Sequence, residues 1–124
     1  MEISFTELAM NLGVMFDTVG AIHGLIVLVK HMSPLQVRLR TKVIEDLHGW
    51  VDDLDKRSKG LVSLFPVLES RGIKIPVPAM QKDVIDGVER LKDAIERSDW
   101  DKAERTIGEL SGMLTGIVIN AVKT

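Results

Sequence analysis

Apolar residues recur at alternating steps of three and four along the first thirty positions of the chain. The series runs through Phe5, Leu8, Leu12, Met15, Val19, Ile22, Ile26 and Val29. This spacing keeps its members on one side of an α-helix and is typical of helices that pack at shallow angles. It predicts a long first helix, with Ser4 or Thr6 as its cap.

The same rhythm returns after a break that ends in Ser33 and Pro34, a residue pair that favours a helix start. The predicted core positions of this second helix are Leu35, Leu39, Val43, Leu47, Trp50, Val51 and Leu54, continued by Leu61, Phe65 and Leu68. Gly60 and Pro66 predict a bend or an interruption between residues 59 and 66.

Two further helices are expected in the second half of the chain. Gly72, Pro76 and Pro78 favour a helix end followed by an extended connection. A third helix from about Pro78 has the apolar positions Val84, Val88, Leu91 and Ile95, and a fourth, capped by Ser98, has Trp100, Ala103, Ile107, Leu110, Leu114, Ile117 and Ala121. The sequence therefore predicts an all-α, up-and-down four-helix bundle with long first and second helices, and residues 1–124 as one domain.

Two rows of glycine lie off these apolar stripes. On a helical wheel, Gly13, Gly20 and Gly24 of the first helix and Gly108, Gly112 and Gly116 of the fourth lie nearly opposite the core side. Each glycine costs a helix about 1 kcal/mol relative to alanine. The rows are either exposed positions that a stable bundle tolerates or places where another helix approaches closely.

Surplus apolar residues favour the close approach. Leu25, Val27, Leu28, Met113, Ile119 and Val122 also lie outside the main stripes. A helix that is apolar most of the way round is usually buried on more than one side. The predicted interface is Gly20, Gly24, Val27, Leu28, Gly108, Gly112, Gly116 and Ile119, with a second copy or a larger protein assembly as the partner.

The first helix is also long enough to span a membrane, from Leu8 to Val29, with Asp17 as its one formal charge. The charge-rich remainder offers no partner span, so we expect a buried helix and no membrane span. The chain has no cysteine and a formal net charge of −2. The absence of cysteine is consistent with a reducing compartment, and we expect a cytoplasmic protein. The negative net charge disfavours general binding of nucleic acid backbones.

Candidate metal and catalytic groups are sparse. A di-metal bundle needs two Glu-x-x-His pairs, and only Glu45 with His48 has that spacing, which favours a surface pair. His23 is expected in a buried or boundary position, and His31 near a helix end. Glu45, Asp46, Asp52 and Asp53 are the densest carboxylates and leave open a Mg²⁺-dependent nucleotide pyrophosphohydrolase-like bundle, although a solvated face is favoured.

A basic cluster follows the first predicted helix. Lys30, His31, Arg38, Arg40 and Lys42 make it up, and Arg38, Arg40 and Lys42 are the candidate contacts of a helical subunit in a nucleic-acid complex. The main prediction is different: a non-enzymatic helical subunit that acts by protein–protein contact and self-association. It needs no metal and no cofactor.

Overall fold

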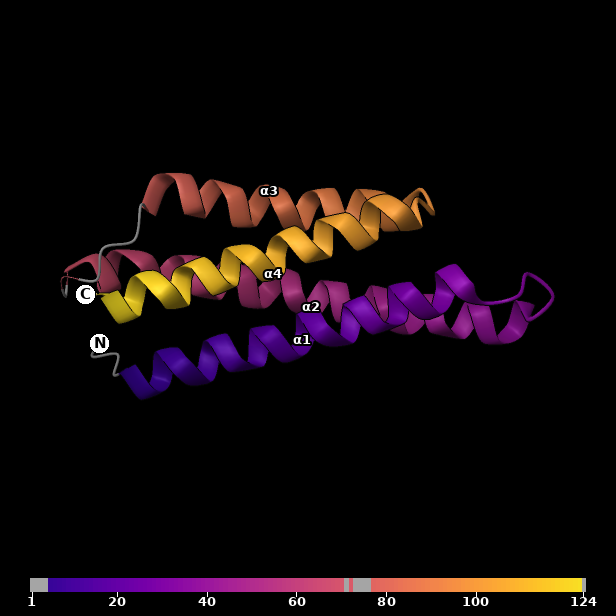
Figure 1. The fold of residues 1–124 in the computed structure, drawn as a ribbon, viewed down its shortest axis with the longest axis horizontal. Coiled ribbons are helices and arrows are strands. Elements are labelled where there is room, and N and C mark those ends of the chain that lie inside the picture. The colour runs from indigo at the N-terminus through magenta and orange to yellow at the C-terminus, as the bar shows by residue number, and fades with distance from the viewer. Residues whose placement is uncertain (1–4, 71, 73–76, 124) are drawn as a thin grey trace.

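Four helices account for nearly all of the chain (Figure 1). The computed structural model describes residues 5–70, 72 and 77–123, with side chains at 10–64, 66, 67, 69, 70, 72 and 82–119. The helices are α1 (Phe5–His31), α2 (Val37–Ser70), α3 (Val77–Glu96) and α4 (Trp100–Lys123). Each packs on its chain neighbours, and α1 also packs on α4, which closes the ring. The all-α, up-and-down bundle with long first and second helices is confirmed.

The three-and-four pattern identifies the core of α1 and α4 correctly. The predicted α1 positions with described side chains are all buried, namely Leu12, Met15, Val19, Ile22, Ile26 and Val29. The same holds in α4 for Ala103, Ile107, Leu110, Leu114 and Ile117, whereas Trp100 is half-buried. The predicted positions Phe5, Leu8, Phe65, Leu68 and Ala121 lie outside the described side chains. The core thus runs between two apolar faces that the sequence alone locates.

The start of α2 differs from the prediction. The helix begins at Val37, and the Gln36 carbonyl accepts the N–H of Arg40 at 2.9 Å at its start. In the preceding turn the Ser33 hydroxyl accepts the N–H of Leu35 at 3.3 Å. Leu35 and Leu39, predicted in the core, are exposed, and so is Trp50. Further along, α2 is continuous through Gly60 and Pro66, so it has no interruption there.

Two turns show how the helices end. Gly72 has a φ of 83° and donates its N–H to the Glu69 carbonyl at 3.0 Å, which confirms the predicted helix-ending glycine. The predicted cap of α4, Ser98, is wrong. The Asp99 carboxylate caps the helix by accepting the N–H of Lys102 at 3.2 Å, and Ser98 adopts a φ of 55° in the turn before it.

The fold requires the missing side chain of Gly87. A Cβ built at Gly87 would stand 2.8 Å from Cδ2 of Leu110, whereas a Cβ built at Gly49 or Gly60 in α2 meets nothing within 4 Å. Gly87 and Leu110 are both buried, at the contact between α3 and α4. The absent side chain therefore lets α3 and α4 come together.

An ion pair fixes the register of α2 against α3. The Asp55 carboxylate lies 3.1 Å from Nζ of Lys92 and 3.1 Å from Nζ of Lys59. Burial alone would raise the pKa of Asp55, but the hydrogen bonds from Lys92 and Lys59 outweigh it and lower that pKa. Glu96, the last residue of α3, stands four positions beyond Lys92, so α3 ends about level with Val51. The α2 segment before Val51 runs past the end of α3.

A buried hydroxyl in α2 gives a stability prediction. Ser58 is fully buried, and its Oγ has no hydrogen-bond partner among the described residues. An unpaired buried polar group costs about 1–3 kcal/mol, and alanine is the better helix former. We expect Ser58→Ala to raise the free energy of unfolding in urea by about 1 kcal/mol. The exposed control Ser63→Ala should change it by under about 0.5 kcal/mol. A destabilised Ser58→Ala variant would contradict this account.

Candidate functional site

The predicted glycine rows lie on the outside of α1 and α4. Gly20, Gly24, Gly108 and Gly112 are exposed, and a Cβ built on any of them meets nothing within 4 Å. Gly116, the last member of the α4 row, is half-buried. Among the described residues, no contact thus requires glycine at these four positions.

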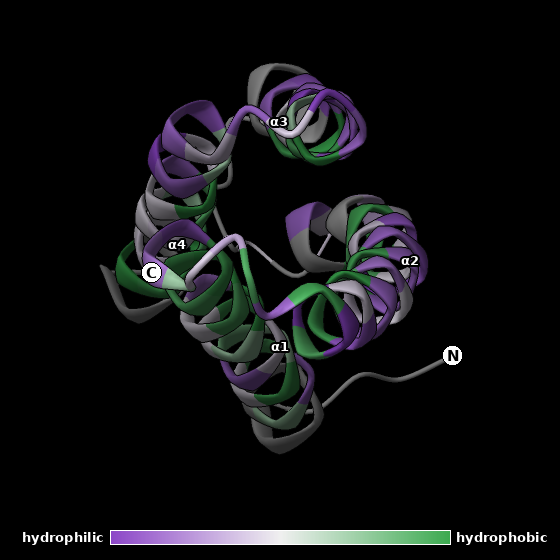
Figure 2. Cartoon of the chain, turned by 90° about the vertical axis from the view of Figure 1, so that its right-hand side faces the viewer, coloured by the Kyte–Doolittle hydropathy of each residue, from purple (hydrophilic) through white to green (hydrophobic). Residues whose placement is uncertain are grey.

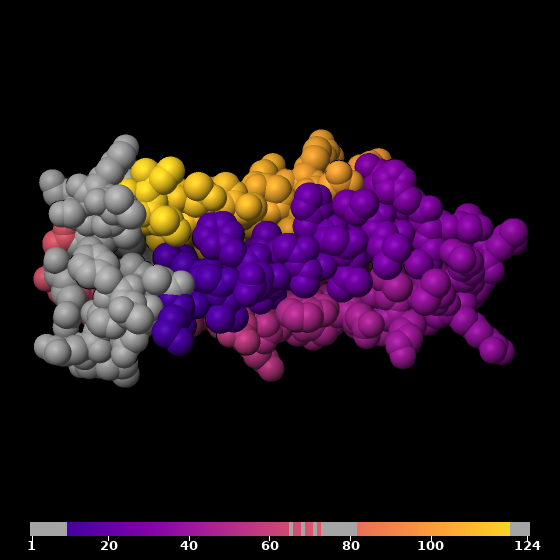
Figure 3. Space-filling view, turned by 60° about the horizontal axis from the view of Figure 1, so that its bottom comes forward, coloured from indigo at the N-terminus to yellow at the C-terminus, as the bar shows by residue number. Residues whose placement is uncertain are grey.

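The two rows stand level with each other. Lys30 near the end of α1 pairs with Asp101 at 2.7 Å and with Glu104 at 3.2 Å, near the start of α4. The two helices run in opposite directions, and each rises about 1.5 Å per residue. Counting back from Lys30 and forward from the acids places Gly24 level with Gly108, and Gly20 level with Gly112. On the helical wheel both rows lie on the outer sides of their helices, and Figure 3 shows α1 and α4 next to each other along one side of the bundle.

We name this side the α1–α4 face, defined by Gly20, Gly24, Val27, Leu28, Gly108, Gly112, Gly116 and Ile119. Its apolar members are incompletely covered: Leu28 and Ile119 are each 48% exposed, and Val27 is half-buried. Leu25 and Met113, the other surplus apolar residues, pack against the core. Val122 lies outside the described side chains. The face therefore combines open backbone with exposed aliphatic side chains.

The apolar surface of α1 extends well beyond its core stripe. Its segment Met10–His31 has 22 residues and a mean hydropathy of 2.0, long and apolar enough to cross a membrane by length and composition. Only 39% of it is buried inside the bundle. In Figure 2 hydrophobic residues colour much of the α1 ribbon, whereas the ribbons of α2 and α3 carry hydrophilic residues on their outer sides. The other helices therefore bury the core stripe of α1 but leave apolar residues outside that stripe exposed.

The predicted basic cluster is divided by its contacts. Hydrogen bonds to Asp101 and Glu104 engage Lys30 and raise its pKa. Arg40 donates from its guanidinium to the Val29 carbonyl at 3.1 Å, and so joins α2 to the end of α1. Arg38 and Lys42 are exposed and pair with no acid among the described residues. Of the arginines and lysines that the sequence groups together, Arg38 and Lys42 are therefore the exposed ones that pair with no acid among the described residues.

The carboxylates converge only in part. Glu45, Asp46 and Asp53 border a shallow hollow on the outer side of α2 with Trp50, but Asp52 is not among its lining residues. Asp53 is already engaged by Nε of Arg57 at 2.7 Å. In the described part of the chain, no group of three or more histidine or acidic residues has a geometry suited to a metal ion.

The histidines are at the surface. His23 is exposed rather than buried or at a boundary as predicted, and it shares a hollow with Lys30, Asp101, Glu104 and Arg105 between α1 and α4. His31 ends α1, where a cation is favoured by the helix dipole. His48 and Glu45 are both exposed on α2, as expected for a surface pair.

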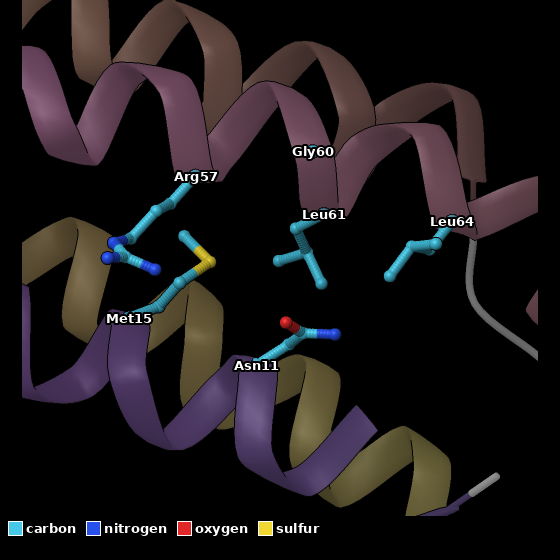
Figure 4. A pocket seen from close by; sticks show the side chains of 6 residues that line it. All are labelled: Asn11, Met15, Arg57, Gly60, Leu61 and Leu64. Carbon is cyan, nitrogen blue, oxygen red and sulfur yellow. The ribbon is translucent and has the colours of Figure 1, made fainter. Parts of the chain in front are cut away.

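A smaller hollow of about 270 Å³ lies between α1 and α2 (Figure 4). Its lining residues are Asn11, Met15, Arg57, Gly60, Leu61 and Leu64. In Figure 4 the Asn11 side chain points toward Leu61 and Leu64, and the Met15 side chain lies beside Arg57. These six residues include no carboxylate, histidine or hydroxyl, so they supply no acid, base or nucleophile.

The chain matches no known family model, no curated protein and no solved structure.

Proposed function

We propose that this chain is a non-enzymatic helical subunit, cytoplasmic in location, that acts by protein–protein contact and associates with itself through the α1–α4 face. The supporting observation is the set of four exposed glycines at two matched levels of α1 and α4. Alanine at each position would favour the isolated helix by about 1 kcal/mol and would meet no obstacle. Close approach of a second protein backbone to this face would explain why glycine rather than alanine occupies these positions.

The neighbouring side chains fit this role. Leu28 and Ile119 are half-exposed aliphatic residues beside the glycine rows. Without side chains in the rows, a facing helix packs close to the backbone, and the aliphatic residues beside it lose contact with water. A second copy of the chain offers the same face. In a two-fold contact the α1–α4 face of one copy packs against the α1–α4 face of the other.

The test is the absolute mass of the full chain in solution, by light scattering behind a sizing column and without detergent. We expect a defined multiple of the 13.8 kDa protomer, with the smaller species appearing on dilution. A monomer at every concentration that the chain tolerates would remove self-association from the proposal. The α1–α4 face would then have to serve a different protein.

A further inference from the structure

One end of the bundle consists of the α1–α2 hairpin alone. Figure 1 shows the turn between α1 and α2 reaching past the turn between α3 and α4, and Figure 3 shows the same protrusion. The Asp55–Lys92 pair places the end of α3 about level with Val51, so α2 extends roughly 20 Å beyond α3. The Lys30–Asp101 pair places the start of α4 beside the end of α1, so the α1–α2 turn and the first turn of α2 are what project beyond α4. We name residues 32–42 the hairpin tip.

The hairpin tip exposes apolar side chains. Leu35 is 91% exposed, Val37 64% and Leu39 51%. Deeper in the same hairpin, Val29 and Val43 are buried, so the hairpin has a core and the three tip residues lie outside it. Three large aliphatic side chains are exposed within five positions of a projecting end. Val37 and Leu39 lie on different sides of the first turn of α2, and Leu35 precedes that turn, so the end exposes apolar side chains around its circumference.

Positive charge alternates with these apolar residues. Arg38, Arg40 and Lys42 follow in the same stretch, and the sequence has no acidic residue between Lys30 and Ile44. Arg38 and Lys42 are exposed and unpaired among the described residues. The tip is therefore locally basic on a chain whose formal net charge is −2.

We infer that the hairpin tip docks on an anionic lipid surface. Leu35, Val37 and Leu39 enter the headgroup region of the bilayer, while Arg38 and Lys42 contact lipid phosphates. Anionic leaflets attract basic segments, and buried aliphatic area adds to that attraction. The charges of the tip and the leaflet are complementary.

The shape of the tip favours lipid over two other partners. Its apolar residues stand on a convex, projecting end, and a deformable lipid surface can accommodate such a shape. A protein partner would need a groove of matching shape that is apolar and lined with acidic residues. Nucleic acid supplies phosphates for Arg38 and Lys42 but no apolar environment for Leu35 along its backbone. Contact at the tip leaves the α1–α4 face free, so this inference does not depend on self-association.

The first test is cosedimentation of the full chain with vesicles. We expect binding to phosphatidylcholine vesicles that contain phosphatidylserine, and little binding to phosphatidylcholine alone. The double variant Arg38→Gln/Lys42→Gln should bind about 25-fold more weakly, at about fivefold for each base removed. Leu35→Gln should bind about tenfold more weakly. The control variants Lys56→Gln/Lys82→Gln and Met10→Gln remove two positive charges and one exposed apolar side chain away from the tip, and they should bind like the wild type.

A second readout places the contact at one residue. Because the chain has no cysteine, Leu35→Cys and Ser70→Cys each take a single environment-sensitive fluorophore. Anionic vesicles should shift the emission of the label at position 35 to the blue and leave the label at position 70, near the far end of α2, unchanged.

Several outcomes would overturn the inference. One is a failure to bind either vesicle, and another is vesicle binding that Leu35→Gln leaves unchanged. A blue shift at position 35 that grows with protein concentration in the absence of vesicles would assign the tip to a protein contact. Tight, salt-sensitive binding to RNA or DNA oligonucleotides that Arg38→Gln/Lys42→Gln abolishes, without vesicle binding, would assign it to nucleic acid.

Discussion

Gly87→Leu is expected to lower the free energy of unfolding by about 1–3 kcal/mol, because it overpacks the contact between α3 and α4. Even the first added carbon would stand 2.8 Å from Cδ2 of Leu110, which is itself buried. The side chain of Leu110 or the whole of α3 must then move away, and packed interiors resist such movement. Urea unfolding followed by circular dichroism measures the loss.

The matched control is Gly49→Leu, the same substitution on the open side of α2. No atom lies within 4 Å of a Cβ built there, so the variant should gain up to about 1 kcal/mol from helix propensity. Trimming Leu110 to alanine should cost less in the Gly87→Leu background than in the wild type, because the two residues share one space. Equal stabilities of Gly87→Leu and Gly49→Leu would show that α3 and α4 do not require glycine at their contact.

Gly112→Leu should weaken self-association at least about tenfold, equivalent to about 1.4 kcal/mol, while leaving the protomer folded. A leucine there projects from the α1–α4 face into the space assigned to the partner. A two-fold contact places this obstacle on both copies. Within the protomer the position is open, so at a protein concentration where both proteins are monomeric the variant should unfold at equal or higher urea concentration. Light scattering and urea unfolding together measure these two opposite effects.

Two variants isolate the cause. Gly49→Leu adds the same side chain away from the α1–α4 face and should keep the wild-type mass. Gly112→Ala adds a single carbon and should weaken association less than leucine does. A Gly112→Leu protein that loses its helical signal would place the glycine row inside the protomer, contrary to the structure. One that unfolds normally and keeps its mass would remove Gly112 from the interface.

The pattern of apolar residues predicts the fold well where each helix is flanked along its length. In α1 and α4 the three-and-four series marks buried positions from Leu12 to Val29 and from Ala103 to Ile117. The same reasoning is wrong at Leu35, in the turn before α2, and at Leu39 in α2. Periodicity describes one helix at a time, and it does not show that α2, at 34 residues, outruns α3, at 20. A correctly spaced residue stays exposed when no helix lies opposite it.

The candidate surfaces divide in a similar way. The wheel predicts the outward direction of Gly20 and Gly112 from sequence, because the direction follows from the core stripe. Their matched levels depend on the contact between Lys30 and Asp101, which no local pattern reveals. The apolar pattern does not single out Gly87 as a close contact between helices, although the spacing of small residues in α3 gives a signal for it. Gly87 lies seven residues before Ala94 on the flank of the Val84–Val88 stripe, and both small residues are buried.

The unequal hairpins also divide the molecule by local stability. Four helices share a core over most of the length, but the first turns of α2 contact α1 without α3 beside them. Segments with few buried contacts open at lower free energy than the core that supports them. The hairpin tip can therefore loosen, or become ordered against another surface, while the four-helix body remains folded. The chain thus joins a stable body to an adaptable end without a linker between them.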